Sequence, residues 1–398
     1  MIDFKLIGCI LMVVGTSIGA GMLALPIATA ELGFIGSLIL LFTCWAVMLS
    51  GALLLLEVNL WLPQRSHLVS MAKATIGPIG QLIAWLAYLL LLYSLLCAYI
   101  AGGSDLLRHL LQTFGMSISP WTAAISFTLL FGWIVYIGVQ MVDYVNRGLM
   151  LFKFITYFGL IAFLTPFLNP ALLAGGALKN ITLGTAITVT ITSFGFGSII
   201  PSLRIYYAGD VRKLKQTIVI GSLIPLIIYA IWDAIIMGVI PLQGTHGLVA
   251  VLNSSDAVSQ LVKTLSGVAM SGTVTLFTKV FTSICVLTSF LCVALSLVDF
   301  VADGFQLEKQ GKANLFIHAI AFLPPLIIVM GFPGIFIDAL QYAGIYCAIL
   351  LLVLPALMAW RGRYYKGVAG RFLVPGGRFL LLLVGMAGLF VIFRGLAG

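Results

Sequence analysis

The sequence predicts an all-helical integral membrane protein with eleven transmembrane helices, two of them broken in the middle. Hydrophobic residues make up 62% of the 398 residues and charged residues only 8%, a composition that a water-soluble domain of this size does not have. Long apolar runs recur along the whole chain, and glycine interrupts two of them at matching places. The chain is therefore expected to lie in a lipid bilayer.

The apolar runs define the expected helices. A helix needs roughly 20 apolar residues to cross the hydrocarbon core of a bilayer, so each such run with few charges is taken as one span. The expected spans lie near residues 5–29, 34–61, 81–103, 121–139, 148–168, 183–204, 216–240, 273–299, 314–331, 336–360 and 379–397. No linker between soluble domains separates them, and a single transmembrane domain over residues 1–398 is expected.

Two of the polar intervals between the spans carry helical patterns of their own. The interval 62–80 is expected to form an amphipathic loop on the cytoplasmic side. The interval 241–272 contains two short helical patterns, which suits a lid on the outer side.

Basic residues are distributed unevenly between the loops. With the amino terminus in the cytoplasm, only Arg108, Lys179, Lys263 and Arg394 fall on the outside, whereas most of the 21 Lys and Arg face the cytoplasm. The positive-inside rule therefore predicts a cytoplasmic amino terminus and a carboxyl terminus on the opposite side. The formal net charge of +9 then follows from membrane topology, and no nucleic-acid partner is expected.

Enzymes and channels are both disfavoured by the motifs. The chain has four His and neither an HExxH nor a GxSxG pattern, so an intramembrane enzyme is not expected. All six cysteines lie within expected spans without the spacing of metal ligands, and no metal or cofactor is expected. A channel would need a repeated filter motif or a ring of charges, and the sequence contains neither.

Glycine breaks the first and the sixth expected spans. The first break is Gly15-Thr16-Ser17-Ile18-Gly19-Ala20-Gly21, and the second is Ser193-Phe194-Gly195-Phe196-Gly197-Ser198. Unwound backbone survives at membrane depth only where it lines a cavity or meets a ligand. A helix-packing face is the alternative for Gly15-x-x-x-Gly19, but a second break in a related span favours a binding site.

The positions of the two breaks predict an internal repeat. Spans 1 and 6 stand five apart, so they cross the membrane in opposite directions. We therefore expect an inverted repeat of five plus five spans, covering about 5–168 and 183–360, with the helix 379–397 added at the end.

These same stretches carry a family resemblance. Gly15 to Pro26 (GTSIGAGMLALP) and Ser193 to Leu203 (SFGFGSIIPSL) resemble the bacterial aromatic amino-acid permeases of the amino acid–polyamine–organocation superfamily. The likeness covers nearly the whole chain, including a loop from Val142 to Gly148 and the Leu287-Thr288-Ser289-Phe290 stretch of span 8. The resemblance implies alternating access and ion-driven uptake of an amino acid across the bacterial inner (plasma) membrane, with the carboxyl terminus in the periplasm.

An amino acid needs donors for its carboxylate and acceptors for its ammonium. Free N–H groups at the start of the outer half of span 1 suit the carboxylate, and helix-end carbonyls near Ser17 and Ser193 suit the ammonium. Matching the superfamily motif adds the carbonyls of Thr190 and Ile191 and places Phe196 over the substrate; a lipid-facing Phe196 is the alternative. The expected substrate-binding residues are Thr16, Ser17, Gly19, Ala20, Gly21, Thr190, Ile191, Ser193, Phe196 and Tyr93.

Lys153 is the charge that we expect to couple transport to an ion gradient. It lies six residues after Arg147, about 9 Å along span 5, and from there it could also extend to the membrane surface. The family resemblance implies that a lysine on span 5 takes the place of the sodium ion that bridges spans 1 and 8 in sodium-coupled relatives. The expected partners are the carbonyls of Gly15 and Ile18 and the hydroxyls of Thr288 and Ser289.

The expected function is therefore proton-coupled import of an aromatic amino acid, tyrosine ahead of the others. Sodium coupling, and permeases for tryptophan or for serine and threonine, are the alternatives within the same fold. Of the remaining charges, Glu57 suits a gate or an interface, with solvation at a helix end as the alternative, and Asp233 and Lys279 lie toward the same outer side, where they could pair.

Overall fold

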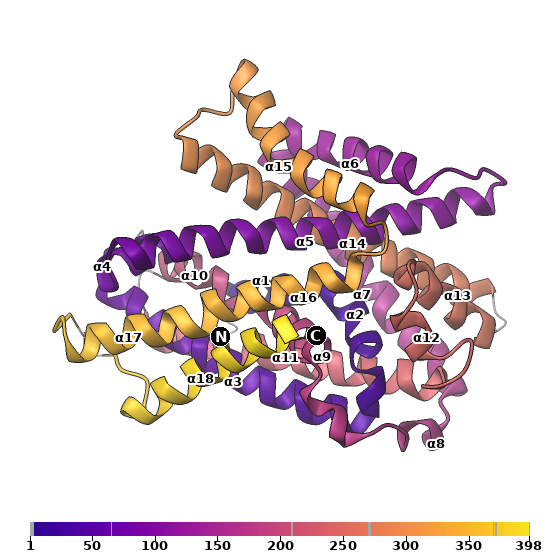
Figure 1. The fold of residues 1–398 in the computed structure, drawn as a ribbon, viewed down its shortest axis with the longest axis horizontal. Helices are drawn as coiled ribbons and strands as arrows, with labels where there is room; N and C mark the ends of the chain where they lie inside the picture. Colours follow the sequence, from indigo (N-terminus) through magenta and orange to yellow (C-terminus); the bar gives the residue numbers. More distant parts are fainter. Residues whose placement is uncertain are drawn as a thin grey trace.

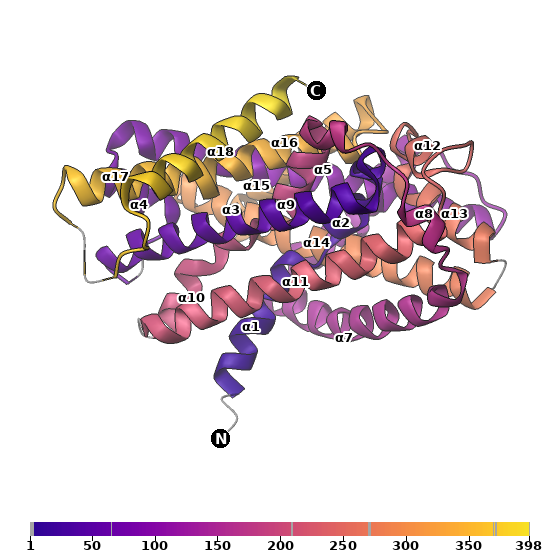
Figure 2. The same cartoon turned by 90° about the horizontal axis from the view of Figure 1, so that it is seen from below.

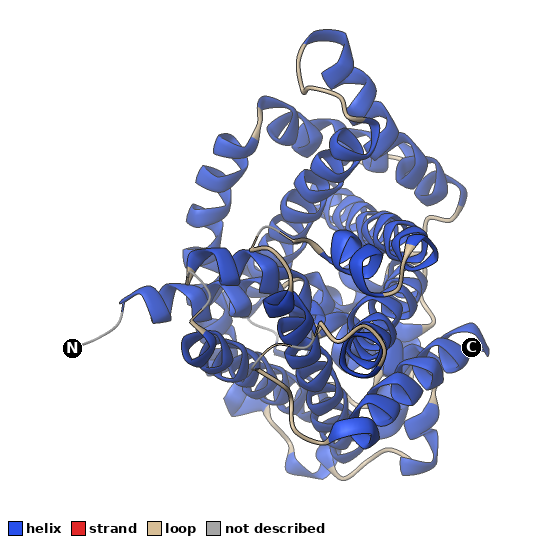
Figure 3. Cartoon of the chain, turned by 90° about the vertical axis from the view of Figure 1, so that its left-hand side faces the viewer, coloured by secondary structure: helices blue, strands red, loops and turns tan. Residues whose placement is uncertain are grey.

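The computed structural model describes residues 4–64, 66–207, 210–269, 272–368, 370 and 372–397. Within these residues all regular structure is helical and no strand occurs, as Figure 3 shows. The helices that form the spans are α1 (Phe4–Ser17), α2 (Ala20–Ala28), α3 (Gly33–Trp61), α5 (Pro78–Thr113), α6 (Pro120–Ile137), α7 (Val139–Leu164), α9 (Gly184–Ser193), α10 (Ile200–Tyr206), α11 (Val211–Val239), α14 (Gly272–Phe305), α15 (Gly311–Gly331), α16 (Phe336–Ala348), α17 (Leu354–Tyr364) and α18 (Gly377–Ala397).

Short helices connect them. These are α4 (Leu68–Thr75), α8 (Pro170–Leu173), α12 (Leu248–Leu252) and α13 (Ala257–Ala269), the 3-10 turns η1 (Ala30–Leu32), η2 (Thr165–Phe167), η3 (Leu178–Thr182) and η4 (Gly195–Ile199), and the π-helical turn η5 (Ile349–Val353). Helix α4 lies in the interval expected to be amphipathic, and α12 and α13 are the two short helices expected between spans 7 and 8.

The number of spans agrees with the sequence. Ten helical stretches of the described chain are long and apolar enough to cross a membrane, and α1 with α2 makes an eleventh that is bent by 52°. The expected all-helical fold with eleven spans is therefore confirmed.

Most long helices run roughly along the longest axis of the molecule (Figure 1). Helices α4 and α17 lie at one end, and α8, α12 and α13 lie at the other. Helix α2 occupies the interior, and all nine of its residues are buried. Helix α1, by contrast, leaves the body of the molecule at an angle and carries the amino terminus outward (Figure 2).

One expected boundary is wrong. The segment from Val142 to Gly148 is expected to be a loop. In the structure it is helical and belongs to α7, which begins at Val139. The turn instead falls on Gly138, whose φ of 126° is open to glycine. Asp143 and Arg147 then stand one helical turn apart and form an ion pair at 2.8 Å, which supports the added helix.

Candidate functional site

The first break separates α1 from α2. Helix α1 ends at Ser17 and α2 begins at Ala20, with Gly19 in an extended conformation between them. The first backbone N–H of α2, on Ala20, donates to the Ser289 hydroxyl of α14 at 3.0 Å. One of the four unpaired donors at this helix start is therefore satisfied by a side chain 269 residues away.

Glycine is required in this break because other elements come very close. A Cβ atom on Gly19 would collide with the Ser289 hydroxyl oxygen, and one on Gly21 would lie 3.1 Å from the Ser193 hydroxyl oxygen. The two glycines therefore let α2 approach α14 on one side and α9 on the other.

The second break has a different local structure. Helix α9 ends at Ser193, the chain continues through the 3-10 turn η4, and α10 begins at Ile200. Phe194 and Phe196 are buried, with 0% and 1% of their surface exposed. The expected breaks in spans 1 and 6 are thus both present, and Phe196 does not face lipid.

Tyr229 joins the two breaks. This residue of α11 is completely buried, and its hydroxyl lies 2.6 Å from the Ser17 carbonyl oxygen and 2.9 Å from the Ser193 carbonyl oxygen. These carbonyls end α1 and α9, where the partial negative charge of each helix dipole is located. The ring also packs edge-on against Phe194, with ring centroids 5.3 Å apart.

The sequence analysis did not identify Tyr229 as a residue of the site. A tyrosine within the apolar run of span 7 is a weak signal, because such residues commonly pack or anchor a helix. Its importance depends on two carbonyls that lie 212 and 36 residues away. Each carbonyl oxygen has two lone pairs, so both can still accept a second hydrogen bond.

Lys153 reaches the same region from α7. Its side chain is 1% exposed, and the ammonium donates to the Ile18 carbonyl oxygen at 2.9 Å. The alternative in which Lys153 extends to the membrane surface is therefore wrong. Burial of an ammonium in a membrane protein is costly and typically marks a functional site.

Two of the other expected partners of Lys153 bond elsewhere. The Thr288 hydroxyl lies 2.9 Å from the Ile284 carbonyl of its own helix, and the Ser289 hydroxyl accepts from Ala20. Gly15 instead provides close packing, since a Cβ there would lie 2.9 Å from Met150 of α7. The structure therefore brings Lys153 to Ile18, while Ser289 holds the start of α2.

The hydroxyls near the breaks bond within their own helices. Each lies at hydrogen-bond distance from a carbonyl one turn earlier: Thr16 and Ser17 to Val13, Thr190 to Ala186, and Ser193 to Val189. The Ile191 carbonyl accepts from the Phe194 backbone at 3.1 Å. Local bonding of this kind is common for Ser and Thr in helices. What the breaks offer a ligand is therefore chiefly backbone.

The tyrosines of span 3 are arranged differently from expectation. The Tyr93 hydroxyl donates to the Ile320 carbonyl of α15 at 2.8 Å, which directs it away from the breaks. Tyr99 is buried, with 7% exposed, and its hydroxyl lies near that of Ser289. Tyr99 is thus the span-3 aromatic that reaches the start of α2.

A third irregularity lies in span 10. The π-helical turn η5 interrupts the helix between α16 and α17. A Cβ on Gly197 of η4 would lie 3.1 Å from Leu351, and one on Gly51 of α3 would collide with the Leu351 carbonyl. π-Turns in helices often occur at functional positions. This one packs directly against the second break.

Of the other charges, Glu57 is bound and the expected Asp233–Lys279 pair is absent. Glu57 accepts two hydrogen bonds from Arg363 of α17, at 2.7 and 2.5 Å, and a third from the Val374 backbone at 2.6 Å. Lys279 is partly exposed and reaches Thr113 at 3.4 Å, whereas Asp233 is buried against Ser37. The two charges were expected to pair because both lie in the same half of neighbouring spans.

Comparisons with known proteins agree with this architecture. The model of the tryptophan/tyrosine permease family matches residues 3–394. The chain is 34% identical over 393 residues to the tyrosine-specific transport system 2 of Haemophilus influenzae, covering 98% of this chain and 96% of that one. It is 30% identical over 384 residues to a tryptophan-specific transport protein of Shigella flexneri, covering 96% and 92%.

A solved structure shows the same fold. The crystal structure of MhsT in complex with L-phenylalanine superimposes with a TM-score of 0.65 at 16% sequence identity, covering 98% of both chains. The match extends over almost the whole length of both chains, so the two proteins share a fold. The resemblance seen at Gly15 to Pro26 and at Ser193 to Leu203 is confirmed, and the chain belongs to the tryptophan/tyrosine permease family, whose members are transporters and not enzymes.

Proposed function

We propose that the protein imports aromatic amino acids, with tyrosine preferred, by proton symport and alternating access. Its family and the tyrosine-specific and tryptophan-specific names of its relatives support the substrate class. The relative with the higher identity of the two is the tyrosine-specific one, at 34%. Tryptophan is the alternative substrate, and sodium the alternative coupling ion.

The proposed substrate site lies between the two breaks. The start of α2 at Ala20 and Gly21 carries the positive end of a helix dipole, which attracts the carboxylate of an amino acid. The ammonium fits beside the carbonyls of Ser17 and Ser193, where Tyr229 already marks the position as one for hydrogen-bond donors. Thr16, Gly19, Thr190 and Ile191 complete this backbone lining.

Aromatic side chains near the breaks suit a substrate ring. Phe196 is buried in η4, and the Tyr99 hydroxyl of α5 lies near Ser289, beside the start of α2. Aromatic rings pack favourably edge-on or offset against one another. We therefore place Tyr99, rather than Tyr93, in the wall that contacts the ring of tyrosine.

The hydrogen bond from Lys153 to Ile18 carries the proposal of proton coupling. A buried ammonium occupies the break of span 1, where a metal cation would otherwise satisfy the carbonyl. Loss of the proton from Lys153 removes the charge that ties α7 to the break. The proton can therefore control whether α1 stays attached to the rest of the bundle.

The arrangement of the two ends supports alternating access. At one end α13 packs on α5, where the Ser259 backbone donates to Asp105 at 2.8 Å and a Cβ on Gly102 would lie 3.1 Å from Phe336. Helix α1 projects sideways from the body, in the half of the molecule that contains α4 and α17 (Figure 2). A half-helix that leaves the body beside its break can move while the α13 side stays packed, which is the kind of movement that alternating access requires.

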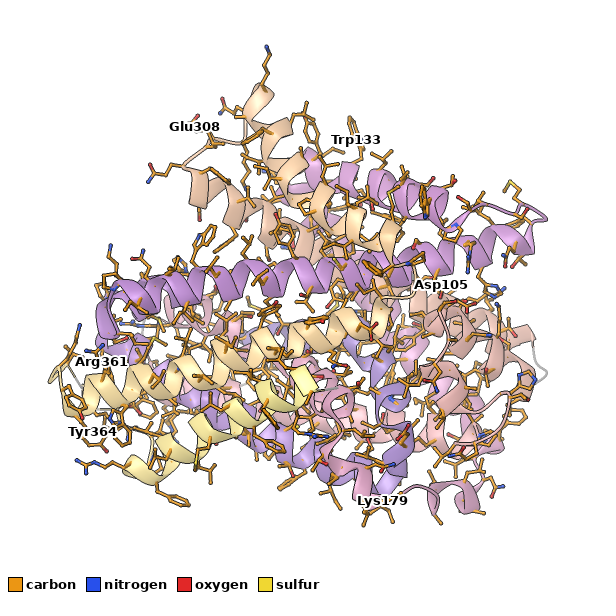
Figure 4. All side chains as sticks on the ribbon, viewed as in Figure 1. Asp105, Trp133, Lys179, Glu308, Arg361 and Tyr364 are labelled. Atoms are coloured by element: carbon orange, nitrogen blue, oxygen red, sulfur yellow. The ribbon has the colours of Figure 1, made fainter. Side chains whose placement is uncertain are left out.

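The distribution of charge supports a cytoplasmic position for α4 and α17. Arg361 lies at that end of the molecule, and Asp105 lies toward the opposite end (Figure 4). Arg361 and Lys366 bond backbone carbonyls of the segment that contains α4. By the positive-inside rule, this arrangement supports a cytoplasmic amino terminus and a periplasmic carboxyl terminus in the inner membrane of a bacterium.

Uptake into proteoliposomes tests the proposal. Labelled tyrosine should accumulate against its gradient when the outside is made acidic, with and without sodium, and a protonophore should abolish the accumulation. Competition with each of the 20 amino acids should rank tyrosine first, then tryptophan and phenylalanine. Accumulation that requires sodium and ignores the protonophore at a held sodium gradient would refute proton symport.

A further inference from the structure

Asp233 is a buried carboxyl that the proposed cycle leaves unused. It lies in α11 with 0% of its surface exposed, and its Oδ2 atom is hydrogen-bonded to the Ser37 hydroxyl of α3. Its Oδ1 atom has no hydrogen-bond partner, and no ion pair within the described residues includes Asp233. An ionised carboxylate buried without a cation costs several kcal/mol, so a bound proton is the expected way to neutralise it.

A row of hydroxyls connects Asp233 to the first broken span. The Ser37 hydroxyl lies 3.2 Å from the Thr29 hydroxyl, and the Thr29 hydroxyl lies 2.7 Å from the Leu25 carbonyl of α2. Thr29 and Ser37 are both completely buried. The row therefore runs from α11 through α3 to α2, the half-helix whose opposite end starts at Ala20.

Counting protons shows which charge state completes this row. A hydroxyl has one hydrogen to donate. If Asp233 is neutral, it donates to Ser37, Ser37 donates to Thr29, and Thr29 donates to the Leu25 carbonyl. If Asp233 is ionised, Ser37 must donate to it, and the single Thr29 hydrogen then serves either Ser37 or Leu25. Only the protonated form makes all three hydrogen bonds.

We propose that Asp233 is a second proton-binding site and that its protonation fastens α2 to α3 and α11 through Ser37 and Thr29. When Asp233 loses this proton, the row makes two hydrogen bonds instead of three, and α2 is held less firmly. The opposite end of α2 carries the proposed carboxylate site. The coupling role rests on the proposed function, whereas the protonation of Asp233 does not.

The surroundings of Asp233 provide no counter-ion. Helix α11 packs against α1, α2, α3, α7, α8 and η2. Tyr157 of α7 is a titratable group near Asp233, and its hydroxyl donates to the Ile228 carbonyl at 3.0 Å. Helices α2 and α8 and the turn η2 contain no titratable residue.

The charged groups on the other neighbours are committed elsewhere or lie far away. Glu57 of α3 is paired with Arg363, Asp143 of α7 with Arg147, and Lys153 with Ile18. The remaining titratable groups on these elements and on α11 are Lys5, Cys9, Cys44, Tyr144, Arg212, Lys213, Lys215 and Tyr229. Arg212, Lys213 and Lys215 begin α11, about 27–32 Å from Asp233 along the helix. Glu31, next to α3, accepts from Asn180 at 3.3 Å.

Infrared spectroscopy of the purified protein tests the protonation without any transport. A carboxylic acid gives a C=O stretching band that a carboxylate does not. We expect wild-type protein at neutral pH to show such a band and Asp233→Asn to lack it, with Asp143→Asn as a matched control that keeps it. Ser37→Ala retains the carboxyl and removes its partner, so the band should persist at a shifted frequency. A difference spectrum without an acid band at neutral pH would overturn the proposal.

Transport measurements test the coupling. Losing one coupled proton lowers the accumulation ratio of tyrosine about tenfold at an imposed gradient of about one pH unit. We expect this loss for Asp233→Asn, with counterflow exchange confirming that the variant is folded. An unchanged proton-to-tyrosine stoichiometry overturns the coupling role, and a band that responds to sodium assigns the carboxylate to a metal cation instead. If wild-type protein shows no proton-driven uptake at all, the proposed function fails, but the infrared result still decides whether Asp233 holds a proton.

Discussion

The hydroxyl of Tyr229 lies 2.6 Å from the carbonyl oxygen of Ser17, although the two residues are 212 positions apart in the sequence. The same hydroxyl reaches the Ser193 carbonyl at 2.9 Å. A single phenol therefore links the ends of the two half-helices that approach the centre of the molecule. Two helix ends with partial negative charge would otherwise face one another with unsatisfied acceptors.

Replacing this tyrosine tests the link. Tyr229→Phe keeps the ring against Phe194 and removes the one hydroxyl hydrogen that the two carbonyls share. Leaving a buried acceptor unpaired costs about 1–3 kcal/mol, so we expect a lower thermal unfolding temperature in detergent and weaker tyrosine binding.

Tyr93→Phe is the matched control for Tyr229→Phe. Tyr93 also donates to a backbone carbonyl, that of Ile320, but it does so away from the breaks. We expect it to lower stability and to leave the KM for tyrosine unchanged. Equal effects of the two variants on KM would mean that Tyr229 has no special relation to the substrate site.

The contrast between Tyr229 and the glycine breaks shows what the sequence could predict. Unwound helices in a membrane need residues that tolerate close approach and unusual backbone, so Gly15, Gly19 and Gly197 mark them directly in the sequence. The eleven spans follow equally directly from their hydropathy. Local composition therefore predicted the fold and the positions of the two breaks.

Partners across the bundle could not be predicted in the same way. Whether Ser289 contacts Lys153 or caps Ala20 depends on how α14 is rotated against α2, and one residue of register changes the answer. The start of α7 was missed because a charged segment after an apolar run is read as a loop. In the structure, Asp143 and Arg147 neutralise one another on a helix that continues past the span.

Lys153 offers the most direct test of ion coupling. Lys153→Met keeps much of the side-chain volume and removes the charge that holds the Ile18 carbonyl. We expect proton-driven accumulation of tyrosine in proteoliposomes to be lost and the dependence of uptake on pH to flatten. Lys279→Met removes a partly exposed lysine from α14 and should behave as wild type. Full pH-driven accumulation by Lys153→Met would exclude the lysine from coupling.

The close contact between Gly19 and Ser289 predicts a compensating pair. Gly19→Ala places a methyl group on the Ser289 hydroxyl, and overpacking of this kind costs on the order of 1–3 kcal/mol. Ser289→Ala removes that oxygen and leaves the Ala20 N–H without its partner.

We expect each single variant of this pair to transport poorly and the double variant to be better than Gly19→Ala alone. Its new Cβ would then face the Ser289 Cβ at 3.6 Å, an ordinary van der Waals distance. Initial rates of tyrosine uptake, corrected for the amount of folded protein, measure this. Strictly additive losses would show that the methyl group and the hydroxyl do not meet.

The ion pair between Glu57 and Arg363 predicts a large effect on stability. Both side chains are almost fully buried, with 0% and 7% exposed, and Glu57 also accepts from the Val374 backbone. Removing one partner leaves an uncompensated buried charge, which costs about 3–5 kcal/mol. Glu57→Met and Arg363→Met should therefore each unfold at a much lower temperature than wild type.

The double variant should recover part of the loss because it buries no unpaired charge, whereas Asp143→Asn, in an exposed pair, should change stability by less than about 1 kcal/mol. If the double variant loses as much stability as the two single variants together, the two charges do not stabilise one another. Packing between α3 and α17 would then be what stabilises this end of the bundle.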